Sequence, residues 1–242
     1  MLLKIDDIKK LHQKKYRSEF GLFLVEGEHL VLELEKASRL NTALNTSELY
    51  VTESHKDFAC RFNKHIISEK NMALISDTTT PQGIVAVAPL LSVTHTHSKN
   101  ARAVYLYEVQ DPGNLGSILR TLAWFGDFRC LLSPGSVDPY NPKVVRASMG
   151  AIFHVPIELD VALESLSERF NDIAVMDMQG NALSDASFRA HDCFLFGNEA
   201  RGVPRECLQA LNATPYSIPG CGAIESLNLA TAVNICAYEL HR

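Results

Sequence analysis

Three stretches after residue 110 combine glycines with side chains that could orient or activate reactants. They are residues 114–120, 196–203 and 217–228. Glycine allows backbone conformations and close approaches that a side chain would forbid, so such loops can turn their amides and carbonyls toward a ligand. The amide, carboxylate and guanidinium groups beside these glycines add hydrogen-bond donors, acceptors and charge. Together these groups favour a site that binds a polar molecule closely.

Arg120 is the permanent charge in the first stretch, six residues after Asn114. It stands among apolar residues, where a guanidinium needs a partner. An anionic ligand such as a phosphate would provide one, and a salt bridge to a core carboxylate would provide another. The residues alone leave both interpretations open. Neither of the first two stretches is a G-x-G-x-x-G or Walker loop, so the sequence gives little support to a dinucleotide or nucleoside triphosphate site.

Short apolar strands that alternate with amphipathic helices predict how these stretches are positioned. The expected strands are residues 104–109, 128–132, 153–157, 173–178 and 193–196, and the expected helices follow 111–114 and cover 142–149, 161–170 and 204–211. This alternation predicts an α/β fold with a mostly parallel sheet and helices on both faces. Ligands of such sheets bind beyond the carboxyl ends of the strands. The loops 110–117, 197–203 and 217–228 are therefore expected to meet there.

A helix is expected after residue 228, because apolar residues recur there at spacings of three and four. They are Leu229, Ala232, Val233, Cys236 and Leu240. A face of small residues lets a helix approach another backbone closely. On its own, this stretch also fits an ordinary C-terminal helix with a glycine-rich entry loop.

Residues 1–90 have a different pattern and are expected to form a small, separate α/β domain. An amphipathic helix with a basic tip is followed by strand candidates at 20–25, 49–52, 65–68 and 84–88. Residues 91–101 are polar and are the expected linker to a second domain over 102–242. His95 and His97 lie in this linker, and we interpret them as linker residues and not as metal ligands.

Composition supports a two-domain globular chain of 242 residues, of which 46% are hydrophobic. No apolar run approaches the roughly 20 residues of a membrane span, and the first residues lack a signal-peptide core, so a soluble, cytoplasmic protein is expected. Six cysteines without a C-x-x-C pair favour buried free thiols over disulfides or zinc ligands. A net charge of −5 argues against non-specific adhesion to nucleic acid, although residues 4–17 are locally basic. A solvated helix face would explain that basic cluster equally well.

Taken in order, the three stretches resemble the SpoU/TrmH family of RNA 2′-O-ribose methyltransferases, within the SPOUT superfamily. The matching residues are Asn114, Gly116 and Arg120, then Gly197, Asn198, Glu199 and Gly202, and then Ile218, Pro219, Gly222, Ser226, Leu227 and Asn228. Residues 143–151 look like the segment between the family's motifs. Residues 15–27 and 81–86 are similar to a substrate-binding domain with the fold of small kink-turn-binding ribosomal proteins. Ala200 departs from the pattern, since many members have glycine after the glutamate.

The resemblance implies a C-terminal SPOUT domain with a deep trefoil knot and S-adenosyl-L-methionine as the methyl donor, without a metal. It implies cofactor-binding residues at Gly197, Asn198, Gly202, Ile218, Gly222 and Leu227. It implies catalytic residues at Arg120, Asn114, Glu199, Ser226 and Asn228. Because a guanidinium is a poor base, we interpret Arg120 as an electrostatic clamp on a phosphate and a developing alkoxide.

The same resemblance predicts the partners. RNA is expected, ribosomal or transfer, and DNA is not, because the acceptor is a 2′-hydroxyl. Lys14, Lys15 and Arg17 are the expected RNA-binding residues. A homodimer with the C-terminal helix at its seam is expected, and no membrane. Two alternatives stay open, a non-catalytic RNA-binding module of the same fold and a SPOUT methyltransferase that acts on a base nitrogen.

Overall fold

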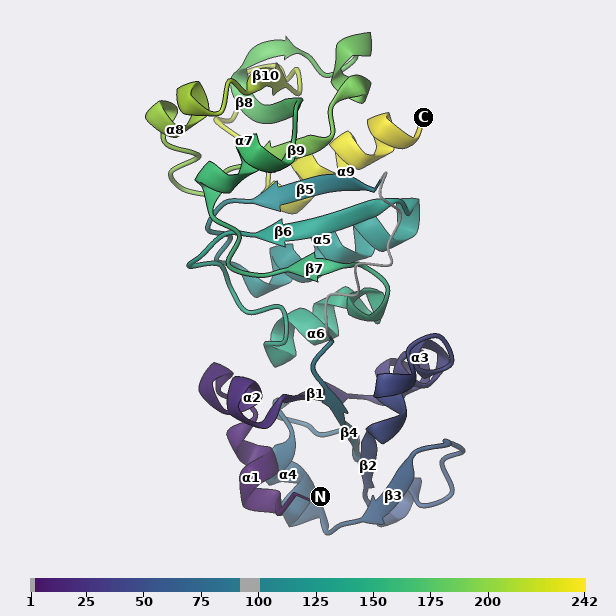
Figure 1. The fold of residues 1–242 in the computed structure, drawn as a ribbon. Helices are drawn as coiled ribbons and strands as arrows, with labels where there is room; N and C mark the ends of the chain where they lie inside the picture. The colour runs from purple at the N-terminus through teal and green to yellow at the C-terminus, as the bar shows by residue number, and fades with distance from the viewer. Residues whose placement is uncertain (1–2, 92–100) are drawn as a thin grey trace. The chain divides into compact units, whose positions relative to one another are not determined.

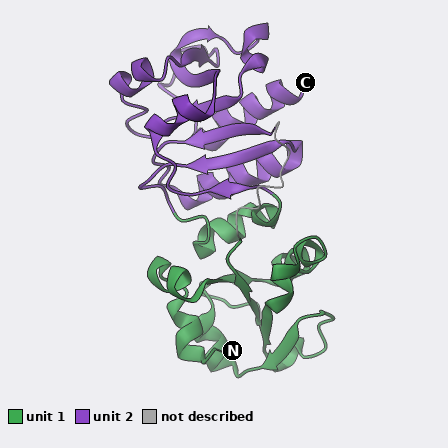
Figure 2. Cartoon of the chain, viewed as in Figure 1, with its two compact units in different colours: residues 1–92, 138–154 green, residues 93–137, 155–242 purple. Residues whose placement is uncertain are grey.

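The computed structural model describes residues 3–91 and 101–242, and the chain forms two compact units (Figure 2). Unit 1 comprises Met1–Ser92 and Asp138–His154, and unit 2 comprises Val93–Val137 and Val155–Arg242. The division of the sequence into 1–90, 91–101 and 102–242 stays a prediction. The compact units differ from it by grouping residues 138–154 with the N-terminal part. Nearly all of the expected linker, with His95 and His97, lies outside the described residues.

Unit 1 is built on a four-stranded sheet of order β1-β4-β2-β3. The strands are β1 (Leu22–Glu26), β2 (Glu48–Val51), β3 (Asn63–Ile66) and β4 (Ile84–Pro89), and β4 is antiparallel to both of its neighbours. The helical elements are α1 (Ile5–Lys10), α2 (Lys14–Phe20), α3 (Glu28–Ser38), η1 (Thr42–Thr46), η2 (Glu53–His55) and α4 (Glu69–Ile75). Apolar side chains of α1, α4 and the sheet form a core cluster that includes Ile8, Met72 and Val85. All four strands expected in this part are present, each shifted by no more than two residues.

Residues 138–154 contribute α6 (Pro142–Ser148) and the 3-10 turn η3 (Ala151–Phe153) to unit 1. The strand expected at 153–157 is wrong, since Phe153 belongs to η3 and only Ile157–Glu158 forms a strand, β7. Left-handed backbone at Met149 and Gly150 turns the chain into η3. Pro156 has no N–H for a strand ladder, which limits pairing before Ile157.

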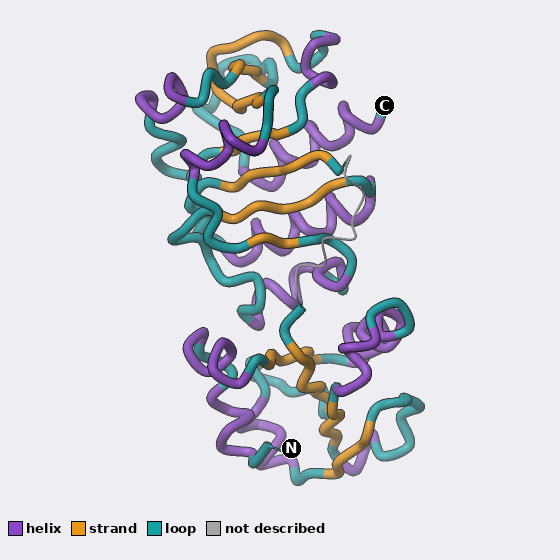
Figure 3. The backbone as a smooth tube through the Cα atoms, viewed as in Figure 1, coloured by secondary structure: helices purple, strands orange, loops and turns teal. Residues whose placement is uncertain are grey.

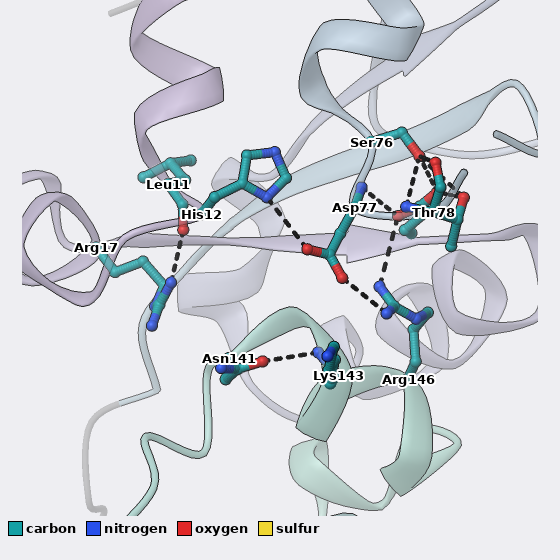
Figure 4. Close-up of polar contacts among 10 residues, drawn as sticks. Leu11, His12, Arg17, Ser76, Asp77, Thr78, Asn141, Lys143 and Arg146 are labelled. Atoms are coloured by element: carbon teal, nitrogen blue, oxygen red, sulfur yellow. Dashed lines mark hydrogen bonds and ion pairs between the residues drawn. The ribbon is translucent and has the colours of Figure 1, made fainter. Parts of the chain in front are cut away.

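Two charged contacts fasten this segment within unit 1, and Figure 4 shows the one between Arg146 and Asp77. Buried Arg17 donates through Nε to Asp138 Oδ2 at 2.9 Å and through Nη1 to the Leu11 carbonyl at 2.8 Å. Arg146 donates through Nη2 to Asp77 Oδ2 at 2.7 Å, and its Nη1 lies 3.7 Å from Glu26 Oε2. The pairs couple sequence-distant segments, and loss of either partner would leave a desolvated charge behind.

The Glu26 carboxylate is largely buried and is also the centre of a small hydrogen-bond network with Ser76, Asp77 and Thr78, three residues that Figure 4 labels. It accepts from the hydroxyl groups of Ser76 and Thr78 and from the backbone N–H of Asp77. These donors offset the cost of burying a carboxylate. The loop after α4 is thereby fixed beside Arg146.

Unit 2 contains a six-stranded parallel sheet of order β10-β8-β9-β5-β6-β7 (Figure 1). The strands are β5 (Arg102–Leu106), β6 (Phe128–Leu132), β7 (Ile157–Glu158), β8 (Ile173–Ala182), β9 (Cys193–Phe196) and β10 (Thr214–Ser217). The expected α/β class with a mostly parallel sheet is confirmed. Strand β10 was not expected, because its sequence contains a proline and lacks an apolar run. Gly180 permits its pairing, since a Cβ there would lie 2.5 Å from the Pro215 carbonyl carbon.

Helices cover both faces of this sheet (Figure 1). On one face lie α5 (Pro112–Phe125) and α9 (Leu229–His241), and on the other η4 (Leu163–Ser165), α7 (Leu166–Arg169) and α8 (Arg205–Ala210), with η5 (Ala186–Ala190) after β8. Alternate strand residues divide between the faces, so that Ala103 and Tyr105 of β5 pack with Leu163 and Leu166. Within 3–91 and 101–242, no helix is long and apolar enough to span a membrane. The strand order does not itself show threading, so the trefoil knot stays a prediction.

Candidate active site

The candidate site lies where β5 and β9 run side by side and in parallel (Figure 3). Strands β6 and β7 follow β5 toward one edge of the sheet, whereas β9 and β8 lie toward the other edge. Loops that leave the carboxyl ends of β5 and β9 therefore turn to opposite sides, and in sheets of this kind the ligand-binding crevice is expected between such loops. The residues after Leu106 and after Phe196 carry the first two sequence motifs.

Asn114 is held at the start of α5. Asp111 caps this helix, and its Oδ1 accepts the backbone N–H of Asn114 at 2.7 Å, with Pro112 in the first turn. Asp at the cap followed by Pro is a strong helix-start signal. Asp111 therefore positions Asn114, although sequence reasoning did not assign it a role.

Asn228 and Glu199 meet Asn114 in a chain of hydrogen bonds. Asn228 Nδ2 donates to Asn114 Oδ1 at 2.8 Å, and Asn114 Nδ2 donates to Glu199 Oε1 at 3.2 Å. Asn228 also caps α9, because its Oδ1 accepts from the backbone N–H groups of Ala230 and Thr231. Three of the five predicted catalytic residues, one from each motif, are thus in direct contact.

Asn198 shapes the second loop from inside. It is buried, its Oδ1 accepts from the backbone N–H groups of Ala200 and Arg201, and its Nδ2 donates to the Glu108 carbonyl at 2.8 Å. Its backbone exchanges two hydrogen bonds with Gly202. These contacts occupy the side chain of Asn198 within the protein. Its role in this structure is to hold the loop. Asn198 fixes the backbone amide of Ala200 even though alanine stands here in place of the glycine of many family members.

Gly197 has a similar internal role. A Cβ at this position would lie 2.6 Å from the carbonyl carbon of Gly202 and 2.9 Å from the Val203 nitrogen. Both are backbone atoms, so a larger residue would displace the turn itself. Glycine is therefore required here for close packing of the loop, whether or not a ligand is also bound against it.

Arg120 and Ser226 are exposed and lie outside the hydrogen-bonded chain. Neither makes a side-chain hydrogen bond or ion pair within the described ranges 3–91 and 101–242, so the salt bridge to a core carboxylate is not observed. Arg120 follows Asn114 by six residues, which is about 9 Å along a helix axis. The Arg120 guanidinium is exposed and is therefore accessible to an anion.

The third loop has the composition and exposure expected of a binding surface for a nucleoside. Between residues 218 and 227, no backbone hydrogen bond is formed with the rest of the described chain. Ile224 and Leu227 expose 72% and 43% of their surface, Ile218 is half-buried, and Gly222 is left-handed with φ 79°. Free amides and carbonyls beside apolar side chains fit S-adenosylmethionine, which has an apolar-faced adenine ringed by polar atoms.

The remaining predicted groups fall elsewhere. Lys14 and Lys15 are exposed on α2 in unit 1, whereas Arg17 is buried and paired with Asp138. The Arg17 guanidinium is not available to a phosphate, and we do not carry it into the RNA-binding set. Groups of three His, Cys, Asp or Glu that could hold a metal are absent from the described part of the chain.

Comparison with known proteins places the chain in a family. The model of the SpoU rRNA Methylase family matches residues 101–238, and that of the MRM3-like substrate binding domain matches residues 3–86. The chain belongs to the SpoU rRNA methylase family. The expected resemblance is confirmed over both halves of the sequence.

Relatives and solved structures extend this finding over the full chain. The 23S rRNA (guanosine(2553)-2′-O)-methyltransferase RlmP of Bacillus subtilis is 32% identical, and the match covers 98% of this chain and 95% of RlmP. A TrmH-family structure from Porphyromonas gingivalis has a TM-score of 0.83 at 29% identity, covering 99% and 98% of the two chains. An AdoMet-bound rRNA methyltransferase from Sinorhizobium meliloti has a TM-score of 0.80 at 27% identity, covering 98% and 93%.

Proposed function

We propose that this member of the SpoU family transfers a methyl group from S-adenosylmethionine to a ribose 2′-hydroxyl in structured RNA. The observation that carries the proposal is the Asn228–Asn114–Glu199 chain, which joins three motifs at the crevice between β5 and β9. The activities named for RlmP and for the AdoMet-bound structure support it. They also favour catalysis over a non-catalytic module, and ribose over a base nitrogen.

The cofactor would be held mainly by backbone groups of residues 217–228 and 197–203. Ile218, Gly222 and Leu227 would line the pocket, together with the left-handed Gly202. Gly197 and Asn198 would serve it indirectly, by fixing the turn that carries Gly202. When bound, S-adenosylmethionine supplies an electrophilic methyl group, and it requires no metal.

The acceptor hydroxyl must be aligned with that methyl group and must lose its proton. Asn114, Asn228 and Ser226 would orient the ribose by hydrogen bonds, and alignment of this kind can lower a barrier by about 7–11 kcal/mol in favourable cases. As the oxygen–carbon bond forms and the carbon–sulfur bond breaks, the proton would pass to Glu199 or to a phosphate oxygen. Arg120 would stabilise the phosphate and the developing alkoxide.

RNA would be bound in part by unit 1, where exposed Lys14 and Lys15 offer phosphate contacts. An RNA acceptor makes the cytoplasm the proposed place of action. We also retain as proposals the substrate-binding domain over 1–90, the linker, the methyltransferase domain over 102–242 and its trefoil knot. The family match to a substrate binding domain at residues 3–86 supports this division.

A homodimer is part of the proposal, with α5 and α9 at the seam. These helices pack together, with the Phe125 and Tyr238 rings 6.3 Å apart, and they expose 85% of Trp124 and 58% of Tyr238. Arg120 precedes Trp124 by one helical turn and so lies on the same side of α5. A seam at Trp124 would place Arg120 near the partner subunit, which would account for its separation from Asn114.

Mapping of 2′-O-methylation in RNA from cells with and without the gene tests the function. We expect one or a few riboses to lose their methyl group when the gene is absent. Purified chain with labelled S-adenosylmethionine should restore the label at the same riboses in that RNA. Unchanged methylation in vivo together with no transfer in vitro would contradict the proposal.

A further inference from the structure

We propose that Arg201 binds a backbone phosphate of the RNA beside the reacting ribose, with Glu108 as the residue that positions it. This inference rests on the proposed function and adds a substrate contact to it. Arg201 follows Glu199 by two residues in the loop after β9. Its guanidinium therefore belongs to the turn that delivers a proposed catalytic carboxylate.

The backbone at Arg201 is fixed. Its N–H donates to Asn198 Oδ1 at 3.1 Å, and the next residue, Gly202, exchanges backbone hydrogen bonds with Asn198 at 2.9 and 3.2 Å. Gly202 has φ 66°, a conformation that glycine adopts without strain. The side chain of Arg201 thus projects from a closed turn whose position is set by buried Asn198.

Glu108 orients the other end of the side chain. Its Oε2 accepts from Arg201 Nη2 at 2.6 Å. Its own backbone is left-handed, with φ 48°, and is held by the Ser133 hydroxyl at its N–H and by Asn198 Nδ2 at its carbonyl. Loops that follow β5, β6 and β9 therefore converge on Glu108. Such convergence makes it a rigid anchor for a guanidinium.

The pair has little value for stability, because 73% of the Arg201 side chain and 30% of the Glu108 side chain are exposed. A guanidinium carries five N–H donors in a planar fork, and the bond to Glu108 is made by one terminal nitrogen. The remaining donors have no hydrogen-bond partner among the described residues, and a guanidinium edge of this kind matches the geometry of a phosphate. A carboxylate that fixes one edge of the fork leaves the other edge ready for an anion.

The charge around the site points to the same ligand. Carboxylates of Glu108, Asp111, Glu199 and Glu225 belong to the loops at this edge, and the whole chain carries a net charge of −5. A polyanion would be repelled unless cations meet its phosphates locally. Arg120 and Arg201 provide such cations within the motifs. Arg201 is more exposed than a buried cofactor contact would be, which favours RNA over the carboxylate of S-adenosylmethionine.

The test compares Arg201→Gln with the wild type and with Arg189→Gln. Arg189 is a matched control, because its Nη2 donates to Glu239 Oε1 at 2.6 Å in a similar partly exposed ion pair, and because it lies in η5, outside the three loops of the site. Ribosomal RNA from cells that lack the gene is the probe. Its binding is measured at several salt concentrations, alongside methyl transfer, S-adenosylmethionine affinity and melting temperature.

Arg201→Gln should lower RNA affinity about 10-fold at low salt and reduce the salt slope by about 0.7–0.9, the contribution of one phosphate. Arg189→Gln should match the wild type. Arg201→Lys should restore the slope and only part of the methylation rate, because a point charge lacks the fork. Glu108→Gln should keep the slope and lower the rate at subsaturating RNA, because the cation remains but is no longer aimed.

Two results would overturn the phosphate contact in an enzyme that methylates this RNA. One is an Arg201→Gln variant with the slope and affinity of the wild type. The other is an unchanged slope with weaker S-adenosylmethionine binding, which would assign Arg201 to the cofactor carboxylate. A wild-type chain that neither binds nor methylates ribosomal RNA, and that also fails with transfer RNA from the same cells, would instead overturn the proposed function and the contact with it.

Discussion

At the scale of residues, the site depends on side-chain amides that donate and accept at once. Asn228 accepts two backbone N–H groups with its oxygen and donates with its nitrogen to Asn114. Asn114 accepts that bond and donates to Glu199. A carboxylate could fill only the accepting half of either role. The two asparagines are therefore matched to their positions by chemistry and not only by size.

Asn228→Asp separates these two roles. Asp caps a helix as well as Asn does, so α9 and the melting temperature should be retained. The donor to Asn114 Oδ1 becomes an acceptor, and we expect methyl transfer to fall by ~10-fold or more, the scale of losing one positioned hydrogen bond in a site. Asn228→Ala is the companion variant and should also destabilise the fold by ~1 kcal/mol. An Asn228→Asp enzyme of normal rate would remove the hydrogen-bond chain from the mechanism.

Arg120 gives the second prediction at this scale. If it clamps the phosphate and the alkoxide, Arg120→Ala should keep S-adenosylmethionine affinity and lower the single-turnover rate by ~10² or more. Arg120→Lys should recover part of that rate. Because Arg120 is exposed and makes no ion pair within residues 3–91 and 101–242, neither change should lower the melting temperature. Normal turnover in a folded Arg120→Ala protein would end this role.

At the scale of elements, the sequence predicts most strand positions and the convergence of the site loops. The strands of unit 1 and strands β6 and β9 are expected close to their observed bounds, because all except β3 are mainly short apolar runs. The meeting of Asn114, Glu199 and Asn228 followed from parallel-sheet topology and the family motifs. These features depend on local pattern or on residue identity at one position.

Features that depend on long-range contacts were not predicted. Strand β10 has no apolar run and exists because Gly180 lets Pro215 approach β8. Arg17 resembled an RNA contact in a basic stretch, but its partner Asp138 lies 121 residues away in the sequence. Glu108 received no role, because its importance comes from three loops that meet only in the folded sheet. A single sequence contains no local signal for such pairings.

The third loop gives a prediction at the same scale. Cys221 is exposed within residues 217–228, whereas Cys130, Cys193 and Cys236 are buried. Burial raises the pKa of Cys130 and Cys193 to about 12, which keeps these thiols protonated and slow to react. We expect a thiol reagent to label Cys221 first, and S-adenosylmethionine to slow that labelling. Peptide mass spectrometry measures both, and equal labelling with and without cofactor would place the pocket elsewhere.

At the scale of the whole molecule, the proposed dimer explains why Arg120 lies apart from the other site residues. The exposed Trp124 and Tyr238 would be covered by a second subunit, and Arg120 would then reach the partner's crevice. Because the contacts at such a seam are mainly aromatic and apolar, the association of the two subunits should persist in high salt. Light scattering should report about twice the chain mass of 26.8 kDa, and Trp124→Glu should shift it to the monomer.

Mixed dimers test whether Arg120 acts across the seam. In a dimer of one Arg120→Ala subunit and one Glu199→Gln subunit, a shared site would combine Arg120 of one chain with Glu199 of the other and would be intact. Random pairing makes half of the dimers mixed with one intact site each, so coexpression should restore about a quarter of wild-type turnover. Each variant alone should be nearly inactive. If coexpressed variants stay as inactive as the separate ones while forming mixed dimers, Arg120 must serve its own subunit, and the seam would then have to act by stabilising the loops and not by completing the site.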